Sequence, residues 1–468
     1  MNILIIGSGG REHAMAWKLA EEPNIDRVYV SPGNGGTGLE EKCENVPLPG
    51  DLREEKTQEA LMEIARNIHA GITVIGPEAP LEAGLVDRFR DNGLPIIGPN
   101  RAASRLETSK SYAKSFMEKY GVRTSRSRFF TGYEAALGYA ENYFKDTLGI
   151  PTGIRSEGSP PGGGDPAGVT SAGAPLVIKA DGLAAGKGVV IALTIEEAEA
   201  SLRSFMKEGR LGKAGKTVVM EEFVEGREVS VLAAVSVSPK RAPFMLPFIS
   251  ARDHKRRFDG GSGPNTGGMG AIAPAPDFFG AAQQDFAARI LAPTLRGMEQ
   301  EGMDYRGFIF FGLMIRENHC YLLEYNARLG DPETQAVLPL MDSNFSDLCL
   351  AILENRLDRF PLMWKKGAVC APVAVAGEIP GFPGYPGPYR NGNPIRVDRE
   401  RLIHAGARLF AAGTAYAGKG EEMLTAGGRV LAVSAWGADG EEARRRAYEG
   451  LAAVSFEGMA FRTDIGRG

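Results

Sequence analysis

Apolar strand segments alternate with helical segments over the first hundred residues, and this alternation constrains the fold more strongly than any other feature of the sequence. Strands separated by helices of this length require right-handed crossovers and therefore form a parallel sheet. Small residues follow each strand, as in Gly7-Ser8-Gly9-Gly10 and Gly98-Pro99-Asn100. These turns fall at the carboxyl ends of the strands, where open α/β sheets bind their ligands. The predicted strands are 2–6, 27–30, 72–75 and 95–97, and the predicted helices are 11–22, 57–70 and 81–92.

The pattern changes after the fourth strand, and this change predicts three domains. They are an α/β domain at 1–103, a larger core at 104–360 with a lid at about 124–225, and a small α+β domain at 361–468. Within the lid, the stretch 148–175 is rich in Gly, Pro and Ser and has no aliphatic periodicity, which predicts a flexible surface insertion. Further helices are predicted at 109–120, 134–145, 195–209, 283–301 and 345–355, and strands at 128–130, 176–179, 189–192, 217–222, 228–237, 308–316 and 320–326.

Charge and cysteine content exclude several classes of function. The chain has 54 basic and 58 acidic residues and a net charge of −4, so no overall field attracts nucleic acid or anionic lipid, and neither is predicted as a partner. No apolar run is long enough to span a bilayer, and the chain starts as a strand without a secretory signal. The four cysteines lack CxxC spacing, which argues against a zinc site or a disulfide framework. We therefore expect a cytoplasmic protein.

The first glycine-rich turn resembles a dinucleotide-binding fingerprint but does not match it. Glu12 stands where the third glycine belongs, and Val30-Ser31 stand where the second strand needs an acidic residue. The helix that follows the turn still offers unpaired N–H groups to an anion. A phosphate monoester fits this turn better than NAD, and a tight turn without a ligand is the alternative.

A second glycine-rich segment, 180–188, departs from the P-loop pattern. Only three residues separate Gly182 from Gly186, and Gly188 replaces the Ser or Thr that would hold magnesium. The segment joins two predicted strands, so its backbone N–H groups and Lys187 can fold over phosphates as a lid. The alternative is a plain hairpin.

The strand 320–326 carries the strongest chemical signal. Glu324 and Asn326 are two residues apart and so project from one face of a strand, where a carboxylate and an amide oxygen suit Mg²⁺. Arg328 falls on the same face if the strand continues, and adds a contact to phosphate. A polar strand end without a ligand is the alternative.

Other polar segments give weaker signals. The strand end at Glu221 can meet an adenine amino group through its carboxylate and backbone carbonyls, and Glu228 can accept hydrogen bonds from ribose hydroxyls. Asp253-His254-Lys255-Arg256 precedes 263–271, a segment so rich in glycine that it suits close backbone approach to a small anionic substrate.

Together these segments resemble the glycinamide ribonucleotide synthetase family of ATP-grasp ligases over nearly the whole chain. The motifs, in the family's order, are Gly9-Gly10-Arg11-Glu12-His13, Pro32-Gly33-Asn34, Gly76-Pro77-Glu78-Ala79-Pro80-Leu81, the segment 179–188, the segment 263–271, Gly330-Asp331-Pro332-Glu333-Thr334-Gln335 and Gly427-Gly428-Arg429-Val430. The chain departs from the family pattern at two places. The first is 148–175, which we expect to lengthen a lid loop and leave the chemistry intact. The second is an extended stretch around 380–388.

The resemblance implies an N-terminal parallel-sheet α/β domain, a two-lobed ATP-grasp core with a lid, and a small C-terminal α+β domain. It also implies a carbon–nitrogen ligase of purine biosynthesis that joins glycine to 5-phosphoribosylamine with ATP, through glycyl phosphate, with Mg²⁺ or Mn²⁺. We expect a monomer whose partners are small-molecule substrates. The alternatives are another ATP-grasp carboxylate–amine ligase of purine metabolism, or a nucleotide-binding regulator without catalysis.

The resemblance also assigns roles to residues that match the family's motifs. The residues assigned to ATP are Lys110, Lys179, Gly182, Gly186, Lys187, Gly188, Glu221, Glu222, Val224 and Glu228. Those assigned to the other substrates are Gly9, Gly10, Asn34, Glu78, Asn265, Gly267 and Asp331. The catalytic residues that it implies are Arg328, Asp253 and Lys255, and the metal ligands are Glu324 and Asn326.

Overall fold

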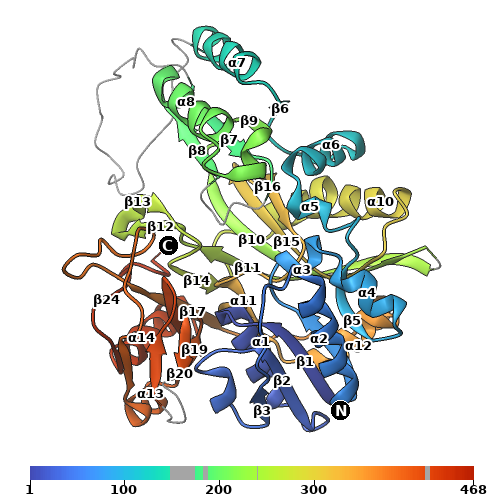
Figure 1. The fold of residues 1–468 in the computed structure, drawn as a ribbon, viewed down its shortest axis with the longest axis vertical. Helices are drawn as coiled ribbons and strands as arrows, with labels where there is room; N and C mark the ends of the chain where they lie inside the picture. The colour runs from blue at the N-terminus through green and yellow to red at the C-terminus, as the bar shows by residue number, and fades with distance from the viewer. Residues whose placement is uncertain (148–173, 183–187, 240, 417–421, 468) are drawn as a thin grey trace.

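The computed structural model of the chain describes residues 1–147, 174–182, 188–239, 241–416 and 422–467. Most of the predicted insertion and part of the glycine-rich hairpin, including Gly186 and Lys187, therefore lie outside the described residues. Figure 1 shows the N-terminal domain at the bottom, the lid at the top, the C-terminal domain at the lower left and the core between them. No helix in the described ranges has the length and apolarity needed to cross a membrane.

The N-terminal domain contains the predicted parallel sheet. Its elements are β1 (Asn2–Gly7), α1 (Gly10–Ala20), β2 (Arg27–Pro32), β3 (Cys43–Asn45), α2 (Glu55–Asn67), β4 (Ala70–Ile75), α3 (Ala79–Glu82), α4 (Leu85–Asp91) and β5 (Ile96–Pro99). The strands pair in the order β5-β4-β1-β2-β3, all parallel. The single helix predicted at 81–92 is wrong, because Gly84 takes a left-handed conformation (φ +85°) and separates α3 from α4.

The core extends this sheet with antiparallel strands. Its elements are α5 (Arg105–Thr108), α6 (Lys110–Tyr120), β10 (Arg227–Ser238), β11 (Arg241–Asp253), β12 (Arg256–Phe258), β13 (Ser262–Asn265), β14 (Gly270–Ala273), α9 (Ala281–Phe286), α10 (Ala292–Gln300), β15 (Tyr305–Arg316), β16 (His319–Asn326), α11 (Glu333–Val337) and α12 (Phe345–Leu353). Tyr305 and Arg306 of β15 pair with β5 and join the two domains. Glycine is needed at this junction, because a Cβ on Gly307 would lie 2.9 Å from the Cα of Gly98.

Strand β11 was not predicted, and its sequence explains why. Pro243 and Pro247 lie within it, and proline argues against an interior strand because it cannot donate a ladder hydrogen bond. The pairing of β11 with β10 shifts register between Val231 and Ala233, and Ala233 lies opposite Pro247.

The lid is a separate antiparallel sheet covered by helices. Its elements are β6 (Ser127–Phe130), α7 (Tyr133–Asp146), β7 (Leu176–Ala180), β8 (Val189–Ala192), α8 (Ile195–Leu202) and β9 (Val218–Glu222), and α8 continues into a π-helical turn at Arg203–Lys207. The strands pair in the order β6-β9-β7-β8. Buried side chains from both helices and from β7 and β9 form a hydrophobic cluster of the lid's own, which includes Phe144, Ile178 and Met220.

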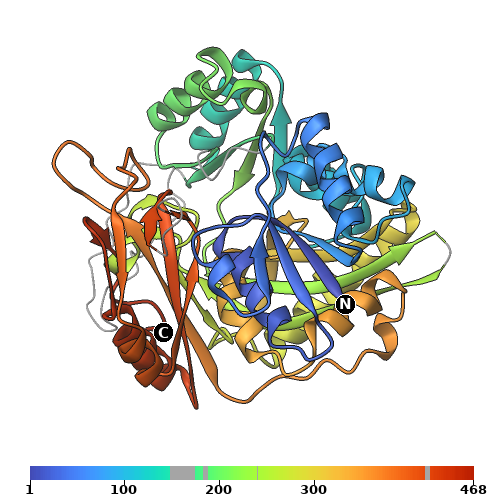
Figure 2. The ribbon, with the colours of Figure 1, turned by 60° about the horizontal axis from the view of Figure 1, so that its bottom comes forward.

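The C-terminal domain continues the main sheet and adds a second small one. Its elements are β17 (Ala368–Ala376), β18 (Pro394–Val397), α13 (Arg399–His404), β19 (Ala407–Ala411), β20 (Thr414–Tyr416), β21 (Met423–Thr425), β22 (Arg429–Gly437), α14 (Gly440–Leu451), β23 (Val454–Ser455) and β24 (Met459–Ala460). Strand β17 pairs with β14, so one sheet runs from β19 through the core to β3. Figure 2 shows the C-terminal strands at the left, beside the N-terminal domain.

Candidate functional site

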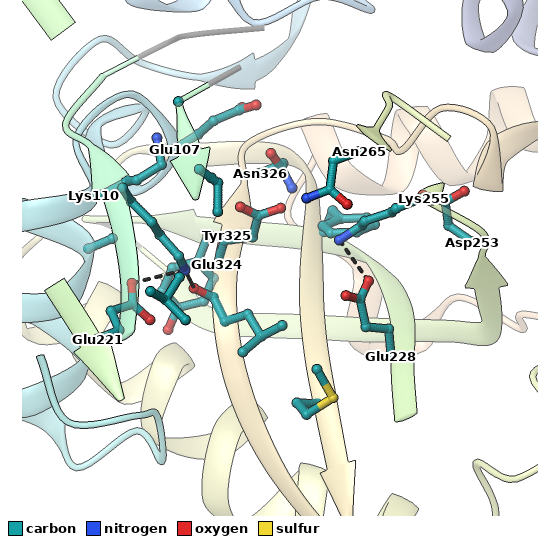
Figure 3. A pocket seen from close by; sticks show the side chains of 18 of the residues that line it. Glu107, Lys110, Glu221, Glu228, Asp253, Lys255, Asn265, Glu324, Tyr325 and Asn326 are labelled. Carbon is teal, nitrogen blue, oxygen red and sulfur yellow. Dashed lines mark hydrogen bonds and ion pairs between the residues drawn. The ribbon is translucent and has the colours of Figure 1, made fainter. Parts of the chain in front are cut away.

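A cleft of about 410 Å³ lies between the lid strands, helix α6 and the core strand β16, and most of the predicted site residues line it (Figure 3). This volume falls within the range of small-molecule sites. The predicted residues that line the cleft are Glu78, Lys110, Lys179, Gly182, Gly188, Glu221, Glu222, Val224, Glu228, Asp253, Lys255, Asn265, Gly267, Glu324, Asn326, Arg328 and Asp331. The fold thus brings together side chains from the lid, the core and the N-terminal domain.

Three predicted substrate residues lie elsewhere. Gly9 lines a smaller cavity of about 240 Å³ in the N-terminal domain, together with Arg11 and Glu12. Gly10 and Asn34 line neither cavity.

The turn between β1 and α1 differs from the open anion site that we expected. The N–H of Gly9 donates to Glu12 Oε2 at 2.6 Å, and Arg11 Nε donates to Glu12 Oε1 at 2.8 Å. Glu12 is 1% exposed, so its own carboxylate takes a place where an anion was expected. A Cβ on Gly10 would lie 2.4 Å from Gln335 Nε2, so this glycine lets α1 pack against α11. The expectation of a free N–H is therefore wrong for Gly9.

Asn34 joins the N-terminal domain to the C-terminal domain. Its amide nitrogen donates to the carbonyls of Ser8 and Ala411, both at 2.9 Å. Its Oδ1 accepts from the N–H groups of Gly36 and Thr37 at 2.8 and 3.0 Å. The side chain is 5% exposed, so in this structure it fixes the position of the two domains instead of facing the cleft.

Lysines from α6 and β7 gather at the lid-side end of the cleft. Lys110 Nζ donates to the carbonyl of Gly182 at 2.9 Å, and burial lowers the pKa of Lys110. Lys179 Nζ lies 2.9 Å from Glu221 Oε1, and Lys114 Nζ lies 2.8 Å from Glu221 Oε2. Burial acts to raise the pKa of Glu221, but the two lysines lower it to about 2. The carboxylate that we expected to meet adenine is thus already held by two ammonium groups.

The far end of the cleft contains a more exposed ion pair and an unpartnered carboxylate. Lys255 Nζ lies 3.0 Å from Glu228 Oε2, and these side chains are 34% and 42% exposed. Figure 3 shows this pair on the opposite side of β16 from Glu221. Asp253 Oδ1 is buried and accepts no hydrogen bond from any described residue. Burial and the neighbouring Glu333 raise the pKa of Asp253.

Glu324 and Asn326 both face the cleft, as their spacing on one strand predicts. Burial acts to raise the pKa of Glu324, but Lys255, Lys179 and Lys110 lower it, so the group is ionised at neutral pH and suits a hard cation. The described residues contain no group of three or more His, Cys, Asp or Glu arranged as a metal site. The carboxylate of Glu324 and the amide oxygen of Asn326 are the kind of hard oxygen donors that would suit a divalent cation.

Arg328 reaches the cleft by a different route from the one expected. Strand β16 ends at Asn326, so Arg328 extends from the loop that follows. Its Nη2 lies 3.0 Å from Glu107 Oε1 and donates to Asn326 Oδ1 at 3.3 Å, and its Nε lies 3.6 Å from Glu78 Oε2. Burial acts to lower the pKa of Arg328, but Glu107 and Glu78 raise it. The guanidinium is thus charged and held in place beside Glu324 and Asn326.

The sequence assigned no role to five charged residues of the site. They are Glu107, Lys114, Arg256 and Glu333, which line the cleft, and Arg429, which pairs with Asp331. Lys114 could have been found, since it follows Lys110 by four residues on a helix and so shares its face. Arg429 stands in a motif that was recognised, but only the fold brings its Nη1 to the carbonyl of Asp331 at 2.7 Å. Glu333 also stands in a recognised motif, Gly330-Asp331-Pro332-Glu333-Thr334-Gln335, whereas Glu107 carries no local signal.

The domain arrangement and the cleft define an ATP-grasp ligase. A solved structure that shares this fold is the biotin carboxylase domain of Hydrogenobacter thermophilus 2-oxoglutarate carboxylase, in complex with MgADP (TM-score 0.67, 15% identity, 98% of this chain and 91% of that one). Three family descriptions match the chain: "Phosphoribosylglycinamide synthetase, N domain" at 1–107, "ATP-grasp (A) domain" at 166–334 and "C domain" at 379–468. The chain belongs to the phosphoribosylglycinamide synthetase family.

Relatives support this assignment over the full length. The phosphoribosylamine–glycine ligase of Clostridium acetobutylicum is 44% identical and covers 100% of both chains. That of Escherichia coli strain K12 is 40% identical and covers 100% of this chain and 98% of its own. The crystal structure of the Thermotoga maritima phosphoribosylamine–glycine ligase has a TM-score of 0.78 at 34% identity and covers 99% of this chain and 100% of that one. The resemblance seen in the sequence is confirmed, and with it the predicted fold class.

Proposed function

We propose that this protein joins glycine to 5-phosphoribosylamine at the expense of ATP, and so forms glycinamide ribonucleotide, ADP and phosphate in purine biosynthesis. The observation that carries the proposal is the pair Glu324 and Asn326 in a chain of this family. The pair faces the cleft among lysines from α6, from β7 and from the loop after β11. The substrates are small molecules, and we propose that the enzyme acts as a monomer in the cytoplasm.

The chemistry begins with the activation of glycine. A carboxylate is a poor acyl donor because oxide would have to leave, whereas transfer of the γ-phosphoryl group gives glycyl phosphate, from which phosphate leaves. Lys110 and Lys179 neutralise the transferring phosphates from the lid side. Glu324 and Asn326 would hold a Mg²⁺ or Mn²⁺ ion, which would supply further neutralisation of the phosphate charge.

Arg328 orients the acyl phosphate. Its guanidinium is fixed by Glu107 and Glu78, so it can present N–H donors to the phosphoryl oxygens without reorganisation. Glycyl phosphate hydrolyses readily, and the lid strands β7 and β8, which border the cleft at Lys179 and Gly188, can exclude water from it.

The attack on glycyl phosphate takes place at the far end of the cleft. The amine nitrogen of 5-phosphoribosylamine forms the C–N bond, phosphate leaves, and the nitrogen loses a proton. Asp253 is suited to take this proton, because its Oδ1 has no partner among the described residues and its pKa is raised by burial. Lys255 then stabilises the phosphate that leaves.

A substrate-omission assay tests the proposed function. ADP release is expected to require glycine and 5-phosphoribosylamine together, and to be lost when either is omitted. Formate or bicarbonate in place of glycine tests the main alternative, another carboxylate–amine ligase of the same fold. Such an enzyme would release ADP with formate or bicarbonate and not with glycine. Nucleotide binding without turnover on any of these substrates would instead indicate a regulator.

A further inference from the structure

A buried cluster at the lid-side end of the cleft contains one more lysine than its carboxylate needs. The side chains of Lys114, Glu221 and Lys179 are 4%, 3% and 9% exposed. Each oxygen of Glu221 faces one of the two ammonium groups, at 2.8 and 2.9 Å. With all three groups ionised the cluster carries a net charge of +1, and an unbalanced charge of this kind is costly to bury.

The local geometry of three elements produces this cluster. Lys114 lies one helical turn after Lys110 on α6 and shares its face. Val177 of β7 lies opposite Glu221 of β9, so Lys179 is a diagonal neighbour of Glu221 on the same face of the lid sheet. The two lysines therefore reach different oxygens of one carboxylate, Lys114 from α6 and Lys179 from β7.

The two lysines differ in how their N–H hydrogens are used. An ammonium group has three donors. Lys114 Nζ has three partners, since it also donates to Thr124 Oγ1 at 2.6 Å and Ser125 Oγ at 3.1 Å. Besides Glu221, Lys179 Nζ has one partner among the described residues, the carbonyl of Leu323 at 3.3 Å, and its side chain lines the cleft. Lys179 is thus the lysine with a donor to spare for a ligand.

We propose that Lys114 is a positioning residue for the nucleotide: it neutralises Glu221 in place of Lys179, and so allows Lys179 to turn its ammonium group toward the phosphates of a nucleoside triphosphate. The inference rests on the proposed function, in which Lys179 contacts ATP. When Lys179 moves, Glu221 keeps Lys114 and the hydroxyl of Ser125, which donates to its Oε2 at 2.8 Å. Without Lys114, the same movement leaves a buried carboxylate without a counter-ion, and phosphate binding must overcome that cost.

The pKa shifts agree with this geometry. Burial lowers the pKa of Lys114 to about 8, although Glu221 opposes the shift. The pKa of Glu221 stays at about 2 despite burial, because both lysines favour the charged form. Lys114 is therefore predominantly charged at neutral pH, as a counter-ion must be.

Lys114→Met tests the proposal, with Lys119→Met on the same helix as the matched control. Lys119 is 63% exposed and pairs with Glu301 at the surface. Titration calorimetry with ATP and Mg²⁺, without glycine, measures the affinity directly. Lys114→Met is expected to weaken ATP binding about tenfold, which corresponds to about 1.4 kcal/mol, and Lys119→Met to leave it within about twofold. Wild-type affinity in Lys114→Met would overturn the proposal.

The Glu221→Gln background separates positioning from a merely structural role. Without the carboxylate, Lys179 no longer has an ion pair with position 221 to give up, so adding Lys114→Met to Glu221→Gln is expected to change ATP affinity by less than about twofold, against about tenfold in the wild-type background. Equal effects in both backgrounds would overturn the proposal. The comparison also holds if Lys114→Met alone fails to fold, because the double variant has an uncharged amide in place of the Glu221 carboxylate; an effect of about tenfold there would overturn the proposal.

Lys179→Met distinguishes this inference from the proposed function. If it leaves ATP binding unchanged, the assignment of Lys179 to the phosphates fails and the inference fails with it. If Lys179→Met weakens binding and Lys114→Met does not, only the inference fails.

Discussion

The two ends of the cleft differ in burial and in the sign of their charge. Lysines outnumber carboxylates at the lid-side end, where the residues are Lys110, Lys114, Lys179, Glu221 and Glu222. Carboxylates outnumber cations at the far end, where the residues are Glu228, Asp253, Asp331, Glu333, Lys255 and Arg429. The central glutamate of the first group is 3% exposed, whereas Glu228 in the second is 42% exposed.

This difference indicates how the substrates are oriented. A triphosphate carries several negative charges and is favoured where cations are in excess, whereas an amine that must lose a proton is favoured near carboxylates. Glu324 and Asn326 lie between the two ends on β16, where the phosphoryl donor and the acyl acceptor would meet. Each prediction below tests one end of the cleft or the point between them.

The largest effect is expected between the two ends. Glu324→Ala removes one of the two proposed metal ligands and should lower kcat by more than about 100-fold, because even outer contacts of a metal site are worth 10- to 100-fold. The chain should stay folded, with a somewhat lower melting temperature, because the lost carboxylate lies among Lys255, Lys179 and Lys110 and helps to balance their charge. Steady-state ADP release and a thermal melt measure both quantities. Full activity in saturating Mg²⁺ would contradict the metal assignment.

At the far end, Asp253→Asn should lower kcat by about 100-fold while leaving ATP affinity unchanged. The amide cannot take up the proton of the amine, and general acid–base groups contribute roughly 100- to 10,000-fold. Single-turnover kinetics gives the rate of C–N bond formation, and titration calorimetry gives the ATP affinity. A weaker ATP affinity with an unchanged rate would reverse the assignment of the two ends.

At the lid-side end, ATP affinity should fall by a few-fold between pH 7 and pH 9. Burial lowers the pKa of Lys114 from 10.5 to about 8, so its charge is present at pH 7 and lost as the pH rises through about 8. The charged groups that act on Lys114 are Glu221, Lys179 and Glu324. Once Lys114 is neutral, Glu221 keeps the ammonium group of Lys179 and the hydroxyl of Ser125, so the release of Lys179 costs more. The decline should be absent from Lys114→Met; the same decline in that variant would assign it to another group.

The smallest effect is expected from Glu222→Gln, next to the buried Glu221. Glu222 is 38% exposed and pairs at 3.0 Å with Arg126, which is 89% exposed, so water screens the interaction. The KM for ATP should change by less than about twofold, compared with a larger change for Glu221→Gln. A large increase in the KM for ATP in Glu222→Gln would contradict this expectation. It would show that Glu222 contacts the nucleotide directly although its side chain is exposed.

The sequence by itself determined the elements and the faces of their side chains. The alternation of strands and helices predicted the parallel sheet, and the spacing of Glu324 and Asn326 placed both in one cleft. These predictions succeed because the period of a strand or helix is a property of the local backbone. Local signals fail where a special conformation or residue interrupts the pattern, as at Gly84 within the predicted helix and Pro247 within β11.

Only the tertiary structure decided which partner each polar group has. Glu12 accepts the N–H of Gly9, Asn34 joins two domains, and Ser125 and Glu221 meet although they are 96 positions apart in the sequence. A buried charge needs a counter-charge or donors, and any element that packs against it can supply them. For that reason the sequence predicted that Glu221 lies in the site, whereas the packing of α6 and β7 around it determined that two lysines hold it there.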